Sequence, residues 1–125
     1  MLPLAAEHGV GVINAAAVSL GLLTPGASKI TGFVHPAAPE VLAAAARLKE
    51  ICAAHGVDVG FLANQYSIQR SGTATTVIGT VNPKHLDSAV LASDAPIDDE
   101  LLAAVLAAAA AVRTQDWISG LPENN

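Results

Sequence analysis

Two short apolar runs separated by helical segments and a long loop constrain the fold of this chain more than any other feature. Residues 10–15 form a continuous apolar stretch flanked by glycine, and residues 75–80 form a second stretch rich in threonine and valine. Such runs are typical of strands covered on both faces, which occur mostly in parallel sheets. A parallel pair needs a long crossover connection, and the segment between the runs supplies one. The sequence therefore predicts an α/β fold with two parallel strands.

The segments around these runs carry helix start and stop signals. Pro39 lies in a first helical turn, Asp58 and Asp98 are N-cap residues, and the pair Asn82–Pro83 starts a helix directly after the second run. Between residues 58 and 70 the apolar positions predict a helix with one buried side. The predicted helices are 39–55, 58–70, 83–92 and 99–112, together with a last helical turn at 2–8 that Gly9 ends. Residues 16–39 are predicted to form a long loop of the kind that usually carries function.

Length and charge narrow the class of protein further. The chain has 125 residues, which is about half of what a closed eight-stranded α/β barrel needs. Its net charge of −5 comes without a basic cluster, which argues against a nucleic-acid partner. The longest apolar run, residues 101–112, is too short to span a membrane. The single cysteine and an N-terminus without a signal-peptide pattern predict a cytoplasmic protein.

Ligands of parallel α/β proteins bind at the carboxyl ends of the strands, which here are residues 14–24 and 79–85. Gly79 lets a ligand approach the backbone, and a helix that starts at Pro83 directs free amide groups and the positive end of its dipole toward the same point. This pattern favours a phosphate site. The alternative is that strand, turn and capped helix are ordinary structure without a ligand.

Other residue groups favour structural roles. Cys52 and His55 share a helix face, but no further ligand lies near enough in sequence to complete a zinc site, so packing is the preferred interpretation. Residues 98–100 form an acidic cluster at a helix start, where carboxylates stabilise the dipole. Gly9 and Gly11 precede the first strand, whereas the glycines of a dinucleotide fingerprint follow it. The sequence offers neither a catalytic constellation nor a metal site.

The segment 9–24, GVGVINAAAVSLGLLT, resembles the seventh strand and following loop of the aldo/keto reductases, in particular the sugar 1-dehydrogenase branch. The resemblance continues through residues 35–40, 52–58, 63–67, 75–80 and 117–122. It implies an incomplete (β/α)8 barrel in which the strands near Val12 and Val77 are the seventh and eighth. Residues 1–125 would then be part of an NADP-dependent oxidoreductase domain.

The resemblance also implies that NAD(P) binds to the loops after the two strands. The residues that it assigns to the cofactor are Ala16, Val18, Gly21, Gly79, Thr80, Val81, His85, Ser88 and Ala89. At residues 16–18 the chain has Ala-Ala-Val where relatives usually have Ser-Pro-Leu, and the only cations available for a 2′-phosphate are Lys84 and His85. The choice between NAD and NADP therefore stays open.

The family's catalytic Asp, Tyr, Lys and His come from the first half of the barrel, so the resemblance implies that this chain alone is inactive. It would act as a fragment of an oxidoreductase for an aldose or aldehyde. The alternative is a non-catalytic half-barrel that binds nucleotide or completes a partner chain. Two strands cannot close a barrel, so an N-terminal half-barrel or self-association is the expected means of covering the exposed faces. A third interpretation is a purely structural alanine-rich domain.

Overall fold

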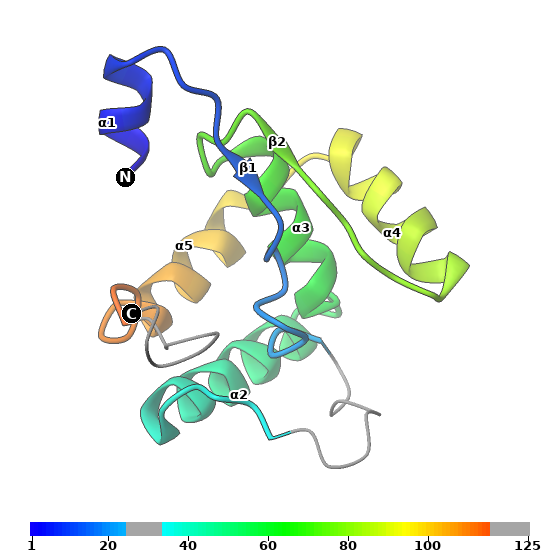
Figure 1. Cartoon of the computed structure of the whole chain (residues 1–125). Helices are drawn as coiled ribbons and strands as arrows, with labels where there is room; N and C mark the ends of the chain where they lie inside the picture. The colour runs from blue at the N-terminus through cyan, green and yellow to red at the C-terminus, as the bar shows by residue number, and fades with distance from the viewer. Residues whose placement is uncertain (25–33, 116–125) are drawn as a thin grey trace.

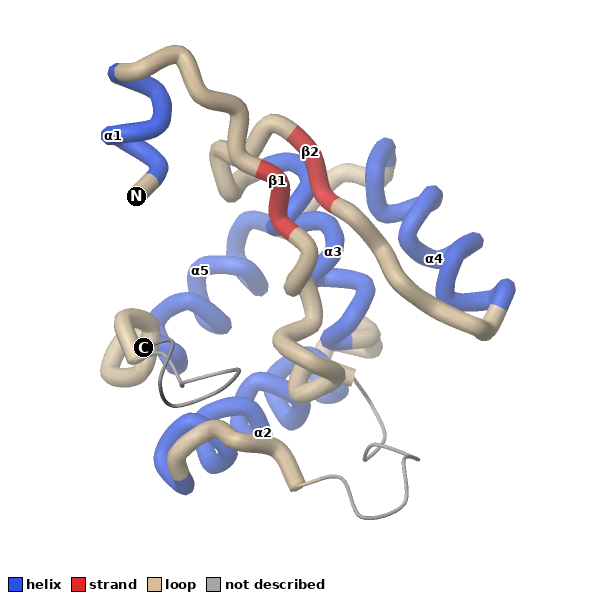
Figure 2. Tube along the Cα trace, in the orientation of Figure 1, coloured by secondary structure: helices blue, strands red, loops and turns tan. Residues whose placement is uncertain are grey.

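A computed structural model describes residues 1–24 and 34–115, and within them two short parallel strands lie against a central helix (Figure 1). The elements in chain order are α1 (Leu2–Glu7), β1 (Ile13–Asn14), α2 (Pro39–Ala54), α3 (Val59–Gln69), β2 (Thr75–Thr76), α4 (Pro83–Asp94) and α5 (Asp99–Ala109). Figure 2 shows the two strands side by side in front of α3, with α4 on one side and α5 on the other. The predicted alternation of strands and helices is confirmed, and residues 117–122 of the resemblance lie outside the described residues.

The two strands pair in parallel, as the crossover argument predicted. Ile13 pairs with Thr75 and Asn14 with Thr76, and the N–H of Val77 donates to the carbonyl oxygen of Asn14 at 2.8 Å. Each strand spans only two residues, so the longer predicted ranges 10–15 and 75–80 are wrong. Among the described residues each strand pairs with one neighbour only. Few interstrand hydrogen bonds are therefore available to keep the flanking backbone in a regular strand, which explains why the strands are short.

The expectation that the strands are covered on both faces is also wrong for this chain. Asn14 and Thr76 are half-buried against α3, whereas Ile13 is 62% exposed and Val77 is 52% exposed. A two-stranded sheet with helices on one face leaves its opposite face to solvent. The sheet therefore presents apolar side chains without cover from the described residues.

The helix ends largely follow the predicted capping signals. Asp58, Asn82 and Asp98 each accept a hydrogen bond from a backbone N–H of the following helix, at 2.9 to 3.1 Å. Gly9 has a φ of +65° and ends α1 in the left-handed region, as expected. Helix α4 continues to Asp94 and α5 stops at Ala109, which differ slightly from the predicted ends. None of the described helices is long and apolar enough to cross a bilayer.

Helix α3 is buried on more than the one side that its sequence predicted. The apolar core joins α2, α3 and α5 through Leu48, Cys52, Val59, Leu62 and Leu101. The polar side chains of α3 are buried as well, and the members of this set are Asn64, Gln65 and Ser67. The sheet, the loop after β1 and α4 surround the remaining sides of α3, which accounts for this burial.

Candidate functional site

A pocket of about 620 Å³ opens at the carboxyl ends of the two strands. Three stretches of chain form its wall: the loop after β1, the first half of α3, and the segment that leads from β2 into α4. The lining residues are Ala15, Ala16, Ala17, Val18, Leu20, Gly21, Thr24, Asp58, Gly60, Phe61, Asn64, Val77, Ile78, Gly79, Thr80, His85 and Ser88. Its volume is within the range of small-molecule sites, and its place agrees with the strand-end rule for parallel sheets.

The structure brings together most of the residues that the resemblance assigned to a cofactor. Those that line this pocket are Ala16, Val18, Gly21, Gly79, Thr80, His85 and Ser88. Val81 lies outside it with a fully exposed side chain, and Ala89 lies outside it because it is buried in α4. Two loops that are distant in the sequence therefore meet at one cavity.

The loop after β1 makes a tight left-handed turn at residues 19–21. Ser19 and Leu20 have φ values of 49° and 55°, and Gly21 follows with 84°. Side chains are unfavourable in this region, so the turn depends on contacts that hold it. One of these is a 2.9 Å hydrogen bond between Nε2 of His35 and the carbonyl oxygen of Ser19. The strain is located at the pocket wall.

A chain of side-chain hydrogen bonds fixes both strands to α3 directly below the pocket. Nδ2 of Asn14 donates to Oγ of Ser67 at 2.6 Å, and the hydroxyls of Ser67 and Thr76 bond at 2.8 Å. Oδ1 of Asn14 also accepts from the N–H of Ala16 at 2.9 Å. Asn14 therefore positions the first loop, and Ser67 connects the two strands.

The second loop is organised around His85. Oδ1 of Asn82 accepts from the N–H of Lys84, which turns Nδ2 of Asn82 toward Nε2 of His85 at 3.2 Å. The other ring nitrogen, Nδ1, lies 3.2 Å from the hydroxyl of Thr80, so both ring nitrogens have a hydrogen-bond partner. The three side chains thus hold the start of α4 against the pocket.

The amide groups available to a ligand differ from the prediction. The first turn of α4 was expected to offer free N–H groups, but Pro83 has none and the N–H groups of Lys84 and His85 are bonded to Asn82. In contrast, the N–H groups of residues 78–81 have no acceptor among the described residues. The backbone that could bind an anion is therefore the extended segment after β2, with the dipole of α4 adding to its effect. Gly79 leaves open space where a Cβ would stand.

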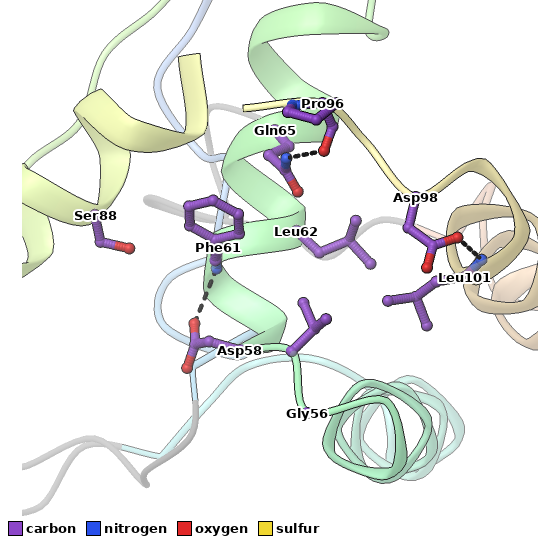
Figure 3. Close-up of a pocket in the computed structure, with 10 residues that line it drawn as sticks. Gly56, Asp58, Phe61, Leu62, Gln65, Ser88, Pro96, Asp98 and Leu101 are labelled. Atoms are coloured by element: carbon purple, nitrogen blue, oxygen red, sulfur yellow. Dashed lines mark hydrogen bonds between the residues drawn. The ribbon is translucent and has the colours of Figure 1, made fainter. Parts of the chain in front are cut away.

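A second, smaller groove of about 330 Å³ lies between α3 and the start of α5 (Figure 3). Three of its polar side chains, those of Asp58, Gln65 and Asp98, are already used within the protein. The carboxylates of Asp58 and Asp98 accept from helix N–H groups, and Nε2 of Gln65 donates to the carbonyl oxygens of Ala95 and Pro96 at 3.1 Å. With these groups satisfied, the groove is explained by the packing of helices.

The structural interpretation of Cys52, His55 and the acidic cluster is confirmed. The side chain of Cys52 is fully buried, and burial, followed by the negative charge of Asp58, raises the pKa of its thiol. Nδ1 of His55 lies 2.9 Å from the carbonyl oxygen of Ile51 at the end of α2. Asp98 caps α5, and Asp99 forms an exposed ion pair with Arg70 at 3.4 Å.

Helix α3 contributes pocket residues that the sequence did not indicate. Gly60, Phe61 and Asn64 line the cavity, although the sequence predicted only a packing role for this helix. One signal was present, since Asn64 is a polar residue in a helix whose sequence predicted burial. A buried amide in such a position requires a hydrogen-bond partner.

This arrangement, in which loops after two parallel strands line a pocket over a helix, defines an α/β fold with a pocket at its strand ends. Residues 1–110 match the family model of the Aldo/keto reductase family, and the chain belongs to this family. It is 30% identical over 128 residues to an L-galactose dehydrogenase of Arabidopsis thaliana. The alignment covers 99% of this chain and 39% of the relative, so the chain spans about two fifths of the relative's length.

Proposed function

We propose that this chain supplies part of the NAD(P) site of an aldo/keto reductase-type oxidoreductase that acts on an aldose or aldehyde. The observation that carries the proposal is the single pocket in which the two strand-end loops meet. In this proposal β1 and β2 are the seventh and eighth strands of a (β/α)8 barrel, whose phosphate sites commonly use the loops after those strands. Residues 1–125 then form one part of the oxidoreductase domain.

The pocket has the properties that part of a dinucleotide requires. The N–H groups of residues 78–80, which have no acceptor among the described residues, suit a pyrophosphate, and the open space at Gly79 allows it to approach the backbone. Ala16, Val18 and Gly21 form the opposite wall, and Thr80, His85 and Ser88 provide polar groups. When bound, the nicotinamide cofactor supplies hydride chemistry, while these residues bind and orient it.

The proton that carbonyl reduction needs comes from elsewhere in this proposal. Tyr66, the only tyrosine, lies on α3 and does not line the pocket. His85 lines it, but both ring nitrogens are engaged by Thr80 and Asn82. We therefore place the catalytic residues in the part of the family barrel that lies outside the aligned 39% of the relative.

We also propose that the uncovered apolar surface contacts the remaining part of such a barrel. Ile13 on the sheet and Val77 directly after β2 are exposed. On α4, Leu86 and Val90 are 52% and 60% exposed and lie one helical turn apart. In a closed barrel, strand side chains pack in interior layers and each helix packs against its neighbours. The unaligned length of the relative supports the remaining barrel part as the occupant over a second copy, because the described residues of two copies provide only four strands of eight.

Titration with NADPH and NADH, followed by nucleotide fluorescence, tests the proposal. Wild-type protein should bind at least one of them. Gly79→Leu should abolish this binding without unfolding the chain, because its side chain enters the open space of the pocket. Gly11→Ala is the matched control, since its Cβ makes only an ordinary 3.6 Å contact with Ala74 outside the pocket. Binding that survives in Gly79→Leu would contradict the assignment of the pocket.

One observation supports the alternative, a non-catalytic module that binds nucleotide. The pocket is lined by residues of this chain alone. Turnover assays with an aldose separate the two functions. Both functions predict binding without turnover by the chain alone. Turnover after addition of the complementary barrel part supports the enzyme fragment, whereas binding that still gives no turnover after this addition supports the module. A structural domain without ligand predicts no binding of either nucleotide.

A further inference from the structure

One face of α3 lies beneath the pocket and carries Gly60, Asn64 and Ser67 at helical spacing. The first and last of these have evident structural roles. A Cβ at Gly60 would stand 3.2 Å from the carbonyl oxygen of Leu23, so glycine is needed for the loop to approach the helix. Ser67 bonds to both strands through its hydroxyl. Asn64 lies between them and contributes to the pocket wall.

Asn64 differs from its neighbours because its polar group is not satisfied. Its side chain is 8% exposed, and among residues 1–24 and 34–115 its Oδ1 is the buried side-chain polar atom without a hydrogen-bond partner. Adjacent Gln65, which is 3% exposed, donates to two carbonyl oxygens. Burying an unpaired amide is unfavourable, and an apolar side chain of similar size would avoid that cost.

We propose that Asn64 is a further nucleotide-binding residue, whose Oδ1 accepts a hydrogen bond from a donor group of the bound nucleotide. This inference rests on the proposed function of the pocket. Ionised phosphate has acceptors only and cannot satisfy this oxygen, whereas the ribose hydroxyls, the exocyclic amino group of adenine and the carboxamide of nicotinamide are donors. Asn64 therefore recognises a nucleoside part of the ligand, while the N–H groups of residues 78–80 bind the pyrophosphate.

Two adjacent variants of the full chain separate ligand binding from stability. Asn64→Leu removes an unpaired amide, so the thermal midpoint without ligand should be unchanged or higher. Its dissociation constant for NADH should rise about tenfold, the effect of losing one hydrogen bond to the ligand. Gln65→Leu is the matched control, because its amide bonds to Ala95 and Pro96 and lines only the smaller groove. It should lower the midpoint and leave the NADH affinity of the folded protein unchanged.

Three probes identify the donor group. Reduced nicotinamide hypoxanthine dinucleotide lacks the amino group of adenine. If wild type binds NADH more tightly than this analogue, and Asn64→Leu binds both equally, the contact is assigned to the base. An equal loss for both dinucleotides assigns it to a group that they share, which is a ribose hydroxyl or the carboxamide of nicotinamide. Inorganic pyrophosphate should bind both proteins equally. A weaker affinity of Asn64→Leu for pyrophosphate would overturn the assignment to the nucleoside part.

The failure of this inference can be distinguished from failure of the proposed function. If wild type binds NADH and Asn64→Leu binds it equally well, only the role of Asn64 is overturned. If wild type binds no dinucleotide, both are overturned. Should the variant fail to fold, NMR of the wild type decides the matter, because the side-chain amide resonances of Asn64 should shift on addition of NADH. Unchanged resonances in saturated protein would overturn the proposal.

Discussion

Removing the hydroxyl of Ser67 should weaken the connection between both strands and α3. Ser67 is 2% exposed, and its hydroxyl bonds to Asn14 at 2.6 Å and to Thr76 at 2.8 Å. Ser67→Ala leaves both partners without this bond, and a buried polar group without a partner costs about 1–3 kcal/mol. Asn14 and Thr76 are only half-buried, so water can reach them and the lower half of that range, about 1–2 kcal/mol, is expected.

Urea denaturation followed by circular dichroism measures this loss. With a denaturant dependence of about 1–3 kcal/mol per molar, the midpoint for Ser67→Ala should fall by about 1 M. Ser93→Ala is the matched control, because the exposed hydroxyl of Ser93 bonds only to Val90 in its own helix. That variant should stay within about 0.5 kcal/mol of wild type. Equal midpoints for the two variants would refute the connecting role of Ser67.

Three further predictions concern the core and the helix ends. Leu101→Ala should lower the free energy of unfolding by about 2–5 kcal/mol, since Leu101 is 1% exposed, and a loss under 1 kcal/mol on urea titration would contradict its place in the core. Asp98→Ala should cost about 1 kcal/mol through loss of the α5 cap, and unchanged hydrogen exchange in the first turn of α5 would contradict this. The thiol of Cys52 should react with Ellman's reagent only after unfolding. Because the folded state raises its pKa, its contribution to stability is complete at neutral pH and is lost as pH rises above about 8.5. Rapid reaction of native protein at pH 8 would contradict the burial of Cys52.

The parts of the fold that the sequence predicted depend on local chemistry. The caps at Asp58, Asn82 and Asp98 act within a few residues of themselves, so their helices could be placed from the sequence. The parallel direction of the strands followed from the crossover between them. Strand length and exposure could not be predicted in this way, because they depend on neighbours that the described residues do not supply.

The candidate site shows the same division between local and distant effects. The strand-end rule marked residues 14–24 and 79–85, and the family resemblance assigned particular residues within these two loops, which share one pocket. The contribution of α3 depends on how that helix packs under both loops, and no local pattern encodes this packing. The sequence did not predict that the N–H groups of Lys84 and His85 are bonded to Asn82. A cap signal predicts where a helix starts. Which N–H groups remain for a ligand depends on the acceptors that the folded chain brings near them.

The most direct test of the central claim is to map the binding of NADPH onto isotope-labelled full-length chain by NMR. If the two strand ends form the nucleotide pocket, backbone amide resonances of Ala16, Gly21, Gly79 and Thr80 should shift together with one affinity. Shifts confined to the smaller groove around Gly56 and Leu101, or no shift at saturating nucleotide, would contradict the account.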